Sequence, residues 1–167
     1  MAASTKKIFS SATDLAKIIK QRKDQGDKIV FTNGCFDLIH TGHTRYLQQA
    51  RMAGDCLVIG VNSDESVRTL KGEKRPIVSL DERMEVLAGF YFIDYIVPFN
   101  ELDPYNLINE LRPSILIKGG DWAVDAIIGK DIVETDGGSV FAVPEIKGQS
   151  TSQIIARIVD RYKPTNN

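Results

Sequence analysis

Stretches with strand character alternate with stretches of helical apolar spacing along most of this chain of 167 residues. Residues 56–61 form a continuous apolar run, which is typical of a strand whose sheet is covered on both faces. Strands that are separated by helices usually run parallel, because each crossover carries the chain back to the same edge of the sheet. The alternation therefore predicts a parallel sheet between two layers of helices. The expected strands are residues 28–32, 56–61, 93–98, 115–118 and 139–143.

Helix boundaries are marked by capping residues as well as by spacing. Ser11 can cap the first helix and Gly26 ends it, whereas Ser79 and Glu82 have the spacing of a capping box. The expected helices are residues 11–25, 42–53 and 65–70, a stretch from Ser79, residues 104–111 and a stretch from Ser152. We predict one Rossmann-like three-layer α/β domain over residues 1–167, with a five-stranded parallel sheet in the order 3-2-1-4-5. Its core is expected at about 28–160 and its N-terminal helix at about 11–25.

Both histidines of the chain lie in residues 32–43, between the first predicted strand and the next helix. A strand, a glycine-bearing turn and a helix start form the geometry in which backbone N–H groups and a helix dipole receive a phosphate. His40 and His43 can add donors to the same anion, because a nearby phosphate favours the charged imidazole. This segment therefore predicts phosphate chemistry.

Two further segments are candidates for the same site. In an open parallel sheet, ligands bind beyond the carboxyl ends of the strands where the strand order reverses. Lys118-Gly119-Gly120-Asp121-Trp122 follows the fourth predicted strand and combines paired glycines with two charges. Gly148-Gln149-Ser150-Thr151-Ser152 precedes the last helix and offers three hydroxyls beside free N–H groups. We expect both segments to lie near the histidines.

Composition limits the partners and the compartment. The formal net charge of −1 argues against a nucleic-acid binder, which would usually be basic. Cys35 and Cys56 are the only cysteines, so no metal spacing or disulfide framework can be predicted and a reducing cytoplasm is the simplest location. The most apolar stretch, residues 90–99, is interrupted by Asp94 and is too short to span a bilayer, so no membrane association is expected.

Several short motifs together carry a resemblance to a known enzyme family. They are Thr32-Asn33-Gly34-Cys35-Phe36-Asp37, His40-Thr41-Gly42-His43, Gly60-Val61-Asn62-Ser63-Asp64, Leu70-Lys71-Gly72, Arg75-Pro76, Lys118-Gly119-Gly120-Asp121 and Ser150-Thr151-Ser152. The His-x-Gly-His motif is typical of a nucleotidyltransferase superfamily, and the Lys-Gly-Gly-Asp and Leu-Lys-Gly motifs narrow the substrate. Over about residues 28–160 the chain resembles the D-glycero-beta-D-manno-heptose 1-phosphate adenylyltransferases.

The resemblance implies transfer of AMP from ATP to heptose 1-phosphate, giving ADP-heptose and pyrophosphate for lipopolysaccharide core synthesis. It implies catalytic roles for His40, His43, Lys71 and Arg83, with Lys71 and Arg83 facing the phosphates. The implied nucleotide contacts are Thr32, Asn33, Gly34, Cys35, Phe36, Gly42, Lys118, Gly120, Ser150, Thr151 and Ser152. The implied substrate contacts are Asp37, Asn62, Asp64, Arg75 and Asp121. Asp37 and Asp121 could bind sugar hydroxyls or orient neighbouring side chains.

The resemblance also implies ATP as co-substrate, Mg²⁺ on its phosphates without identifiable protein ligands, and a homodimer or higher homo-oligomer. The sequence departs from the related glycerol-phosphate cytidylyltransferases in one segment. Those enzymes typically have an arginine before the Ser-Thr motif, whereas this chain has Pro144-Glu145-Ile146-Lys147-Gly148. Which cation acts from that side is therefore open.

Three alternative functions share part of this sequence pattern. A cytidylyltransferase acting on glycerol 3-phosphate or a similar phospho-alcohol would use the same chemistry, and spacing does not reveal the nucleobase. A nucleotide-binding sensor without turnover would keep the binding residues. A serine hydrolase is excluded, because Gly148-Gln149-Ser150-Thr151-Ser152 lacks the last glycine of a nucleophile elbow and no histidine follows Ser150.

Overall fold

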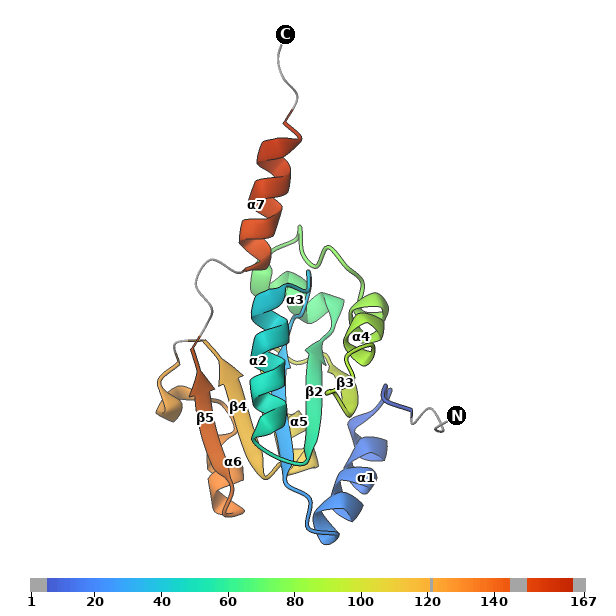
Figure 1. Cartoon of the computed structure of the whole chain (residues 1–167), viewed down its shortest axis with the longest axis vertical. Coiled ribbons are helices and arrows are strands. Elements are labelled where there is room, and N and C mark those ends of the chain that lie inside the picture. The colour runs from blue at the N-terminus through green and yellow to red at the C-terminus, as the bar shows by residue number, and fades with distance from the viewer. Residues whose placement is uncertain (1–5, 121, 145–149, 164–167) are drawn as a thin grey trace.

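The predicted sheet is present in the computed structural model, which describes residues 6–120, 122–144 and 150–163. All its strands are parallel and their order is β3-β2-β1-β4-β5, as predicted (Figure 1). The bounds are β1 Ile29–Gly34, β2 Cys56–Asn62, β3 Tyr95–Phe99, β4 Ile115–Gly119 and β5 Ser139–Val143.

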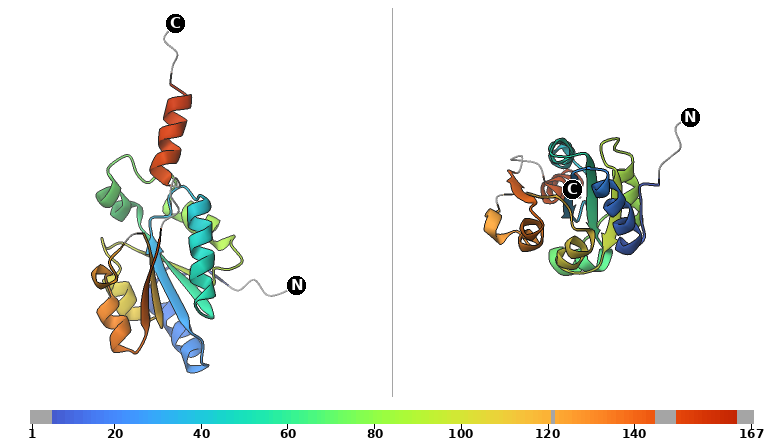
Figure 2. Two further views of the ribbon diagram at one scale, coloured as in Figure 1. Left: turned by 60° about the vertical axis from the view of Figure 1, so that its left-hand side comes forward. Right: turned by 90° about the horizontal axis from the view of Figure 1, so that it is seen from below.

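Helices cover both faces of the sheet, and α2 lies on the opposite face from α5 and α6 (Figure 2). Helix α7 extends beyond the carboxyl ends of the strands (Figure 1). The bounds are α1 Ala12–Asp24, α2 Thr41–Met52, α3 Asp64–Lys71, α4 Leu80–Ala88, α5 Tyr105–Leu111, α6 Lys130–Thr135 and α7 Thr151–Arg161. None of the described helices has the length and apolar character needed to cross a membrane.

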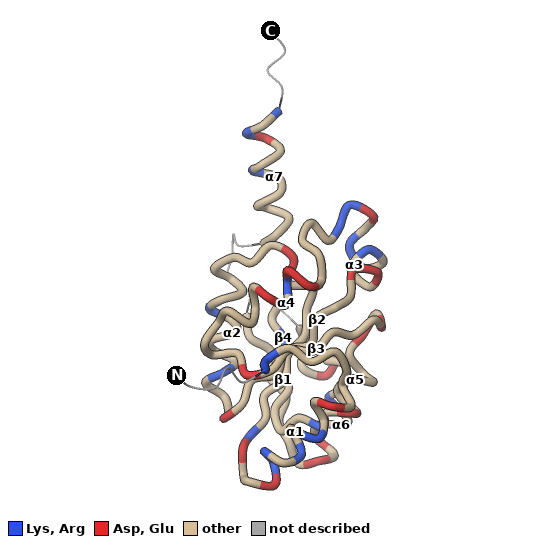
Figure 3. The backbone as a smooth tube through the Cα atoms, turned by 90° about the vertical axis from the view of Figure 1, so that its right-hand side faces the viewer, with Lys and Arg blue, Asp and Glu red and all other residues tan. Residues whose placement is uncertain are grey.

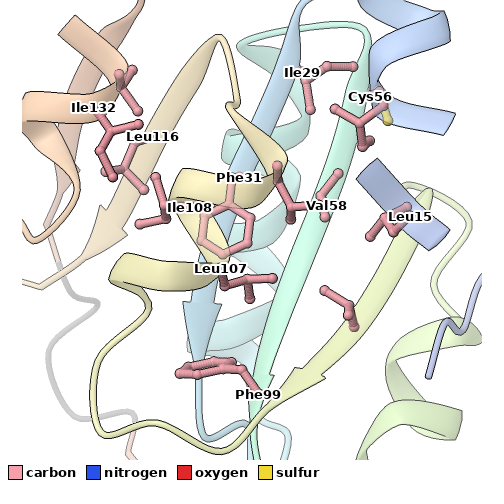
Figure 4. Close-up of a cluster of buried hydrophobic side chains, with 14 of the residues drawn as sticks. Leu15, Ile29, Phe31, Cys56, Val58, Phe99, Leu107, Ile108, Leu116 and Ile132 are labelled. Carbon is pink, nitrogen blue, oxygen red and sulfur yellow. The ribbon is translucent and has the colours of Figure 1, made fainter. Parts of the chain in front are cut away.

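Two apolar cores hold the layers together, one on each face of the sheet. Figure 4 shows the first core, in which Phe31 of β1 lies among side chains from α5, β2 and β4. The second core packs Leu47 of α2 and Leu87 of α4 against the other face. Burial of each such side chain contributes about 1.5–3 kcal/mol relative to exposure. Because both faces are covered, β2 is buried along its whole length, as its continuous apolar run predicted.

The first strand separates from β4 at its carboxyl end. Pairing with β2 continues from Ile29 to Gly34, whereas pairing with β4 is found at Val30 and Phe31. The strand order reverses between β1 and β4, so this is the point at which an open parallel sheet offers a crevice. The carboxyl end of β1 therefore pairs with β2 on one side and borders a crevice on the side of β4.

Several details differ from the sequence prediction, and one of them is that β3 begins at Tyr95 instead of residue 93. The structure contains α6 and a 3₁₀ turn at Val124–Ala126, where no helix was expected between the fourth and fifth strands. At six residues α6 is too short for its apolar period to stand out. Strand β1 also continues through Asn33 and Gly34, which were expected in the turn. The extent of the domain over residues 1–167 stays a prediction.

Candidate active site

A cavity of about 610 Å³ opens at the carboxyl ends of β1 and β4. Most of the residues that the sequence singled out line it, although they come from segments far apart in the chain. Those lining residues are Asn33, Gly34, Cys35, Phe36, Asp37, His40, Gly42, His43, Asn62, Lys71, Arg75, Lys118, Ser150, Thr151 and Ser152. The structure thus brings together the three segments that were expected to meet.

Other expected site residues lie elsewhere. Thr32, Asp64, Arg83 and Gly120 are not part of the cavity lining. Thr32 is fully buried, and its hydroxyl lies 2.5 Å from the hydroxyl of Tyr46. Asp121 and most of the segment before Ser150, residues 145–149, lie outside the described residues.

The two histidines form a stacked pair at the start of α2. His40 occupies the N-cap position of the helix and His43 lies in its first turn. Their ring centroids are 3.9 Å apart with planes inclined by 28°. Both line the cavity, so an anion bound at the helix start would meet the two rings together with backbone N–H groups.

The environment of His43 favours its neutral form when no anion is bound. Burial and, as a smaller cause, the charge of neighbouring His40 together lower the pKa of His43 to about 4. Its Nδ1 atom is enclosed and has no hydrogen-bond partner among the described residues. The expected charged imidazole therefore requires a compensating negative charge, which a phosphate in the cavity would provide.

The stability of the fold is expected to decrease as the pH falls from about 6.5 to about 4. In this range the unfolded chain binds a proton at His43, with an ordinary pKa of 6.5, while the folded chain does not. The loss from this group is about 3 kcal/mol at full effect. Urea unfolding at several pH values, on the wild type and on His43→Gln, measures it. Parallel stability profiles for the two proteins would show that His43 does not titrate in this way.

The turn after β1 has a conformation suited to close approach of a ligand. Phe36 adopts a positive φ of 48°, which is uncommon for a residue with a side chain. Its buried ring lies over Gly34, where a Cβ atom would come within 3.2 Å of the ring. A side chain at position 34 would therefore require the Phe36 ring to shift by a few tenths of an ångström. The residues of this turn form one wall of the cavity.

Two lysines provide positive charge in the cavity that the histidine pair lines. Lys118 at the end of β4 donates from Nζ to Asn33 Oδ1 at 3.2 Å, which bridges the gap between β1 and β4. Burial lowers the pKa of Lys118, and the charge of Lys71 lowers it further. Lys71 is the last residue of α3, beside the charged loop that follows this helix (Figure 3). Two nearby ammonium groups that repel each other are stabilised by binding an anion between them.

The thiol of Cys35 lies in the same wall. Burial raises the pKa of Cys35, although the charges of Lys71 and Arg83 act in the opposite direction. A thiol with a raised pKa is a poor nucleophile at neutral pH. A nucleophilic role is therefore not favoured, and the nucleotide contact expected of Cys35 stays a prediction.

Helix α7 begins at the edge of the cavity with its own capping residue. Ser150 accepts a hydrogen bond from the backbone N–H of Gln153, and Thr151 donates to the carbonyl of Leu38 at 3.3 Å. The second contact attaches the start of α7 to the histidine segment. A second helix N-terminus thus faces the same space as α2.

The acidic residue expected at the substrate is held by protein groups instead. The side chain of Asp37 is fully buried and accepts from Arg75 Nε at 2.5 Å. It also accepts from the backbone N–H groups of Ile77 and Val78 at 2.8 and 2.9 Å. Burial raises the pKa of Asp37 while these hydrogen bonds lower it, and the net change is downward. Asp37 was expected either to bind sugar hydroxyls or to orient neighbouring side chains. These hydrogen bonds match the second role.

The position of Arg83 differs from the expectation that its side chain faces the phosphates. Its side chain is completely buried beneath the turn, and its donors are directed at protein carbonyls and at Asp64. Asp64 is correspondingly paired with Arg83 at 2.8 Å and does not line the cavity. Asn62 does line it, but its amide donates to Ser66 Oγ.

Comparisons with known proteins identify the family and the fold of this chain. The family model described as Cytidylyltransferase-like matches residues 31–165 of the chain. The chain belongs to the cytidylyltransferase-like family. Membership confirms the nucleotidyltransferase class that the His-x-Gly-His motif predicted.

Curated relatives of this cytidylyltransferase-like chain are considerably longer than it is. The Bifunctional protein HldE of Geobacter sulfurreducens is 53% identical over 148 residues, and that of Syntrophotalea carbinolica is 50% identical over 149 residues. Each match covers 89% of this chain and 30% of the relative. The chain thus spans about 30% of the length of the curated relatives it matches.

Solved structures share its fold. The lipopolysaccharide core biosynthesis protein from Thermoplasma volcanium GSS1 has a TM-score of 0.61 at 27% identity, with coverage of 74% of this chain and 100% of that one. The pantoate-beta-alanine ligase from Francisella tularensis, in complex with beta-gamma ATP and beta-alanine, has a TM-score of 0.63 at 14% identity, with coverage of 94% and 78%. The second likeness concerns the fold alone, and it confirms the Rossmann-like class.

Several lining residues of this cytidylyltransferase-like chain were not predicted as site residues. Tyr46 of α2 donates to the carbonyl of Ile117 at 3.0 Å, and burial raises the pKa of its hydroxyl to about 12. Its ring packs where a Cβ atom on Gly119 would come within 3.2 Å. The apolar side of the cavity lining includes Leu102, Trp122 and Ile128. The rule that ligands bind at strand ends could have indicated Leu102, which lies three residues after β3.

Proposed function

We propose that this chain transfers AMP from ATP to D-glycero-beta-D-manno-heptose 1-phosphate, producing ADP-heptose and pyrophosphate. The observation that carries the proposal is the stacked histidine pair at the start of α2, which lines the same cavity as Lys71 and Lys118. Family membership and the relatives called Bifunctional protein HldE support nucleotidyl transfer. The choice of ATP and heptose is supported by the motif resemblance.

The proposed reaction is a single displacement at phosphorus. An oxygen of the sugar 1-phosphate attacks the α-phosphorus of ATP, and the bond from that phosphorus to the bridging oxygen of the β-phosphate breaks. The attacking oxygen is already ionised near neutral pH, so neither a strong base nor a covalent nucleophile is needed. The protein has to hold two anions in line and stabilise the additional charge at the α-phosphate.

The residues around the cavity have the chemistry for those two tasks. His40 and His43 with the start of α2 would stabilise charge on the triphosphate, and the start of α7 would receive its outer phosphates. Lys118 would help to place the sugar phosphate. Arg75 stays a candidate at the substrate, because it lines the cavity while it is held by Asp37. The substrate contact expected of Asp121 also stays a prediction.

Magnesium is expected with the nucleotide, and the described side chains do not fit a site held by protein alone. Within the described ranges, no group of three or more His, Cys, Asp and Glu side chains could hold a metal ion. The carboxylate of Asp37 is already occupied by hydrogen bonds. Mg²⁺ commonly retains water and binds through substrate phosphates, so the nucleotide itself would be its main ligand.

A substrate panel tests the proposal. Pyrophosphate release is measured with each nucleoside triphosphate against heptose 1-phosphate and against glycerol 3-phosphate, and the highest kcat/KM is expected for ATP with heptose 1-phosphate. A clear preference for CTP with glycerol 3-phosphate would instead identify a cytidylyltransferase of that type. If calorimetry shows that a nucleotide binds but no acceptor supports pyrophosphate release, the protein would be identified as a sensor.

Location and assembly also stay predictions. The cysteine content favours a cytoplasmic protein, and the family resemblance implies small-molecule substrates and a homodimer or higher homo-oligomer. Cytoplasmic synthesis would fit a reaction that consumes ATP. Light scattering after size exclusion would determine the number of copies.

A further inference from the structure

Arg83 is the largest fully buried side chain described, and it is surrounded by acceptors. Its Nε donates to the carbonyl of Val78 at 3.1 Å, and its Nη1 donates to the carbonyl of Cys35. Its Nη2 donates to the carbonyl of Asn62 and to Asp64 Oδ1, both at 2.8 Å. One guanidinium thus joins the turn after β1, the end of β2, the start of α3 and the segment before α4.

The network closes on itself through Val78. The carbonyl of Val78 accepts from Arg83, while its N–H donates to Asp37 at 2.9 Å. Asp37 lies two residues after Cys35, whose carbonyl also accepts from Arg83. The turn is therefore tied twice to the same segment, once by its carbonyl and once by its carboxylate. Planar, multiple hydrogen bonding of this kind requires the guanidinium fork, which lysine lacks.

The contact to Cys35 determines where the following N–H points. In a planar trans peptide the C=O and the next N–H are directed to opposite sides. Since the carbonyl of Cys35 points to Arg83, the N–H of Phe36 points away from it. Cys35 and Phe36 both line the cavity. Phe36, whose N–H belongs to this peptide, has an unusual positive φ.

We propose that Arg83 is a positioning residue, which holds the Cys35–Phe36 peptide with its N–H available to a phosphate in the cavity. The inference rests on the proposed function, because it assigns this peptide to the nucleotide triphosphate. Arg83 acts through the backbone and does not touch the substrate. Asp64 balances the charge of the buried Arg83 side chain, so the positioning of the peptide requires both Arg83 and Asp64.

The test compares Arg83→Lys with Arg22→Lys. Arg22 is a matched control, because it is partly buried and paired with Asp27 at 2.6 Å, but it does not line the cavity. Arg83→Lys is expected to raise KM for ATP at least tenfold and to lower kcat/KM by about thirtyfold to a hundredfold, whereas Arg22→Lys keeps both. Asp64→Asn, which is milder, should shift KM for ATP in the same direction by a few fold.

Chemical rescue separates positioning from a general loss of structure. Millimolar guanidinium is expected to restore at least a tenth of the kcat/KM that Arg83→Ala loses, while methylammonium at the same concentration restores none. If Arg83→Ala does not fold, the lysine and asparagine variants give the result. Unchanged KM for ATP and kcat in Arg83→Lys, at a temperature where it is folded, would overturn the inference.

Failure of the proposed function would be recognised separately. If the wild type releases no pyrophosphate with any acceptor, the binding of inorganic triphosphate is measured by calorimetry for wild type, Arg83→Lys and Arg22→Lys. A loss of at least tenfold in affinity confined to Arg83→Lys would support the positioning role without the reaction. Equal affinities in the three proteins would refute it.

Discussion

Replacing His43 with alanine is expected to lower kcat for nucleotidyl transfer by about a hundredfold or more while the fold stays intact. The ring stacks on His40 at the start of α2 and lines the cavity, so its removal takes away a donor from the triphosphate. The neutral form is favoured without a ligand. Because the negative charge at the α-phosphate increases in the transition state, the charged imidazole would act mainly there. The loss should therefore affect kcat more than KM.

Steady-state kinetics and a circular-dichroism spectrum of His43→Ala provide the measurement. Arg45→Ala is the matched control, since Arg45 is an exposed residue of the same helix that does not line the cavity. The control should retain wild-type kinetics. A kcat of His43→Ala close to that of the wild type would remove this histidine from the mechanism.

Replacing Asp37 with alanine is expected to destabilise the fold by about 3 kcal/mol at neutral pH. The carboxylate is fully buried, and its removal leaves Arg75 without its ion-pair partner. It also leaves the N–H groups of Ile77 and Val78 without their acceptor. An uncompensated buried charge and two lost acceptors each carry a desolvation cost.

Urea unfolding at pH 7 measures this effect. Asp136→Ala is the control, because Asp136 forms a comparable pair with Arg112 at the surface, where solvent screens the interaction. Its loss should change the free energy of unfolding far less. Since the pKa of Asp37 is lowered in the folded protein, its contribution is present above its ordinary pKa of 3.8 and is lost as the pH falls further. Equal destabilisation by the two variants would contradict a special role for Asp37.

The sheet order and the segments that line the cavity could be predicted because they depend on local signals. Apolar runs, caps and glycines identify the elements, and right-handed crossovers restrict how parallel strands can be ordered. The strand-turn-helix geometry around His40 and His43 is likewise contained in a dozen consecutive residues. Helix α6 was missed because its six residues are fewer than two turns, so no apolar period can be recognised.

The amino-acid sequence alone determined which chemical groups this protein has and in which order its strands and helices follow. It did not reveal that Arg83 is buried, because a basic residue in a capped helix looks the same whether it faces a phosphate or four protein acceptors. Only the tertiary structure decided this, by bringing Cys35, Asn62, Asp64 and Val78 around one guanidinium. The physical reason is that burial and hydrogen-bond partners arise from contacts between segments distant in the chain, whereas periodicity and capping arise from neighbours.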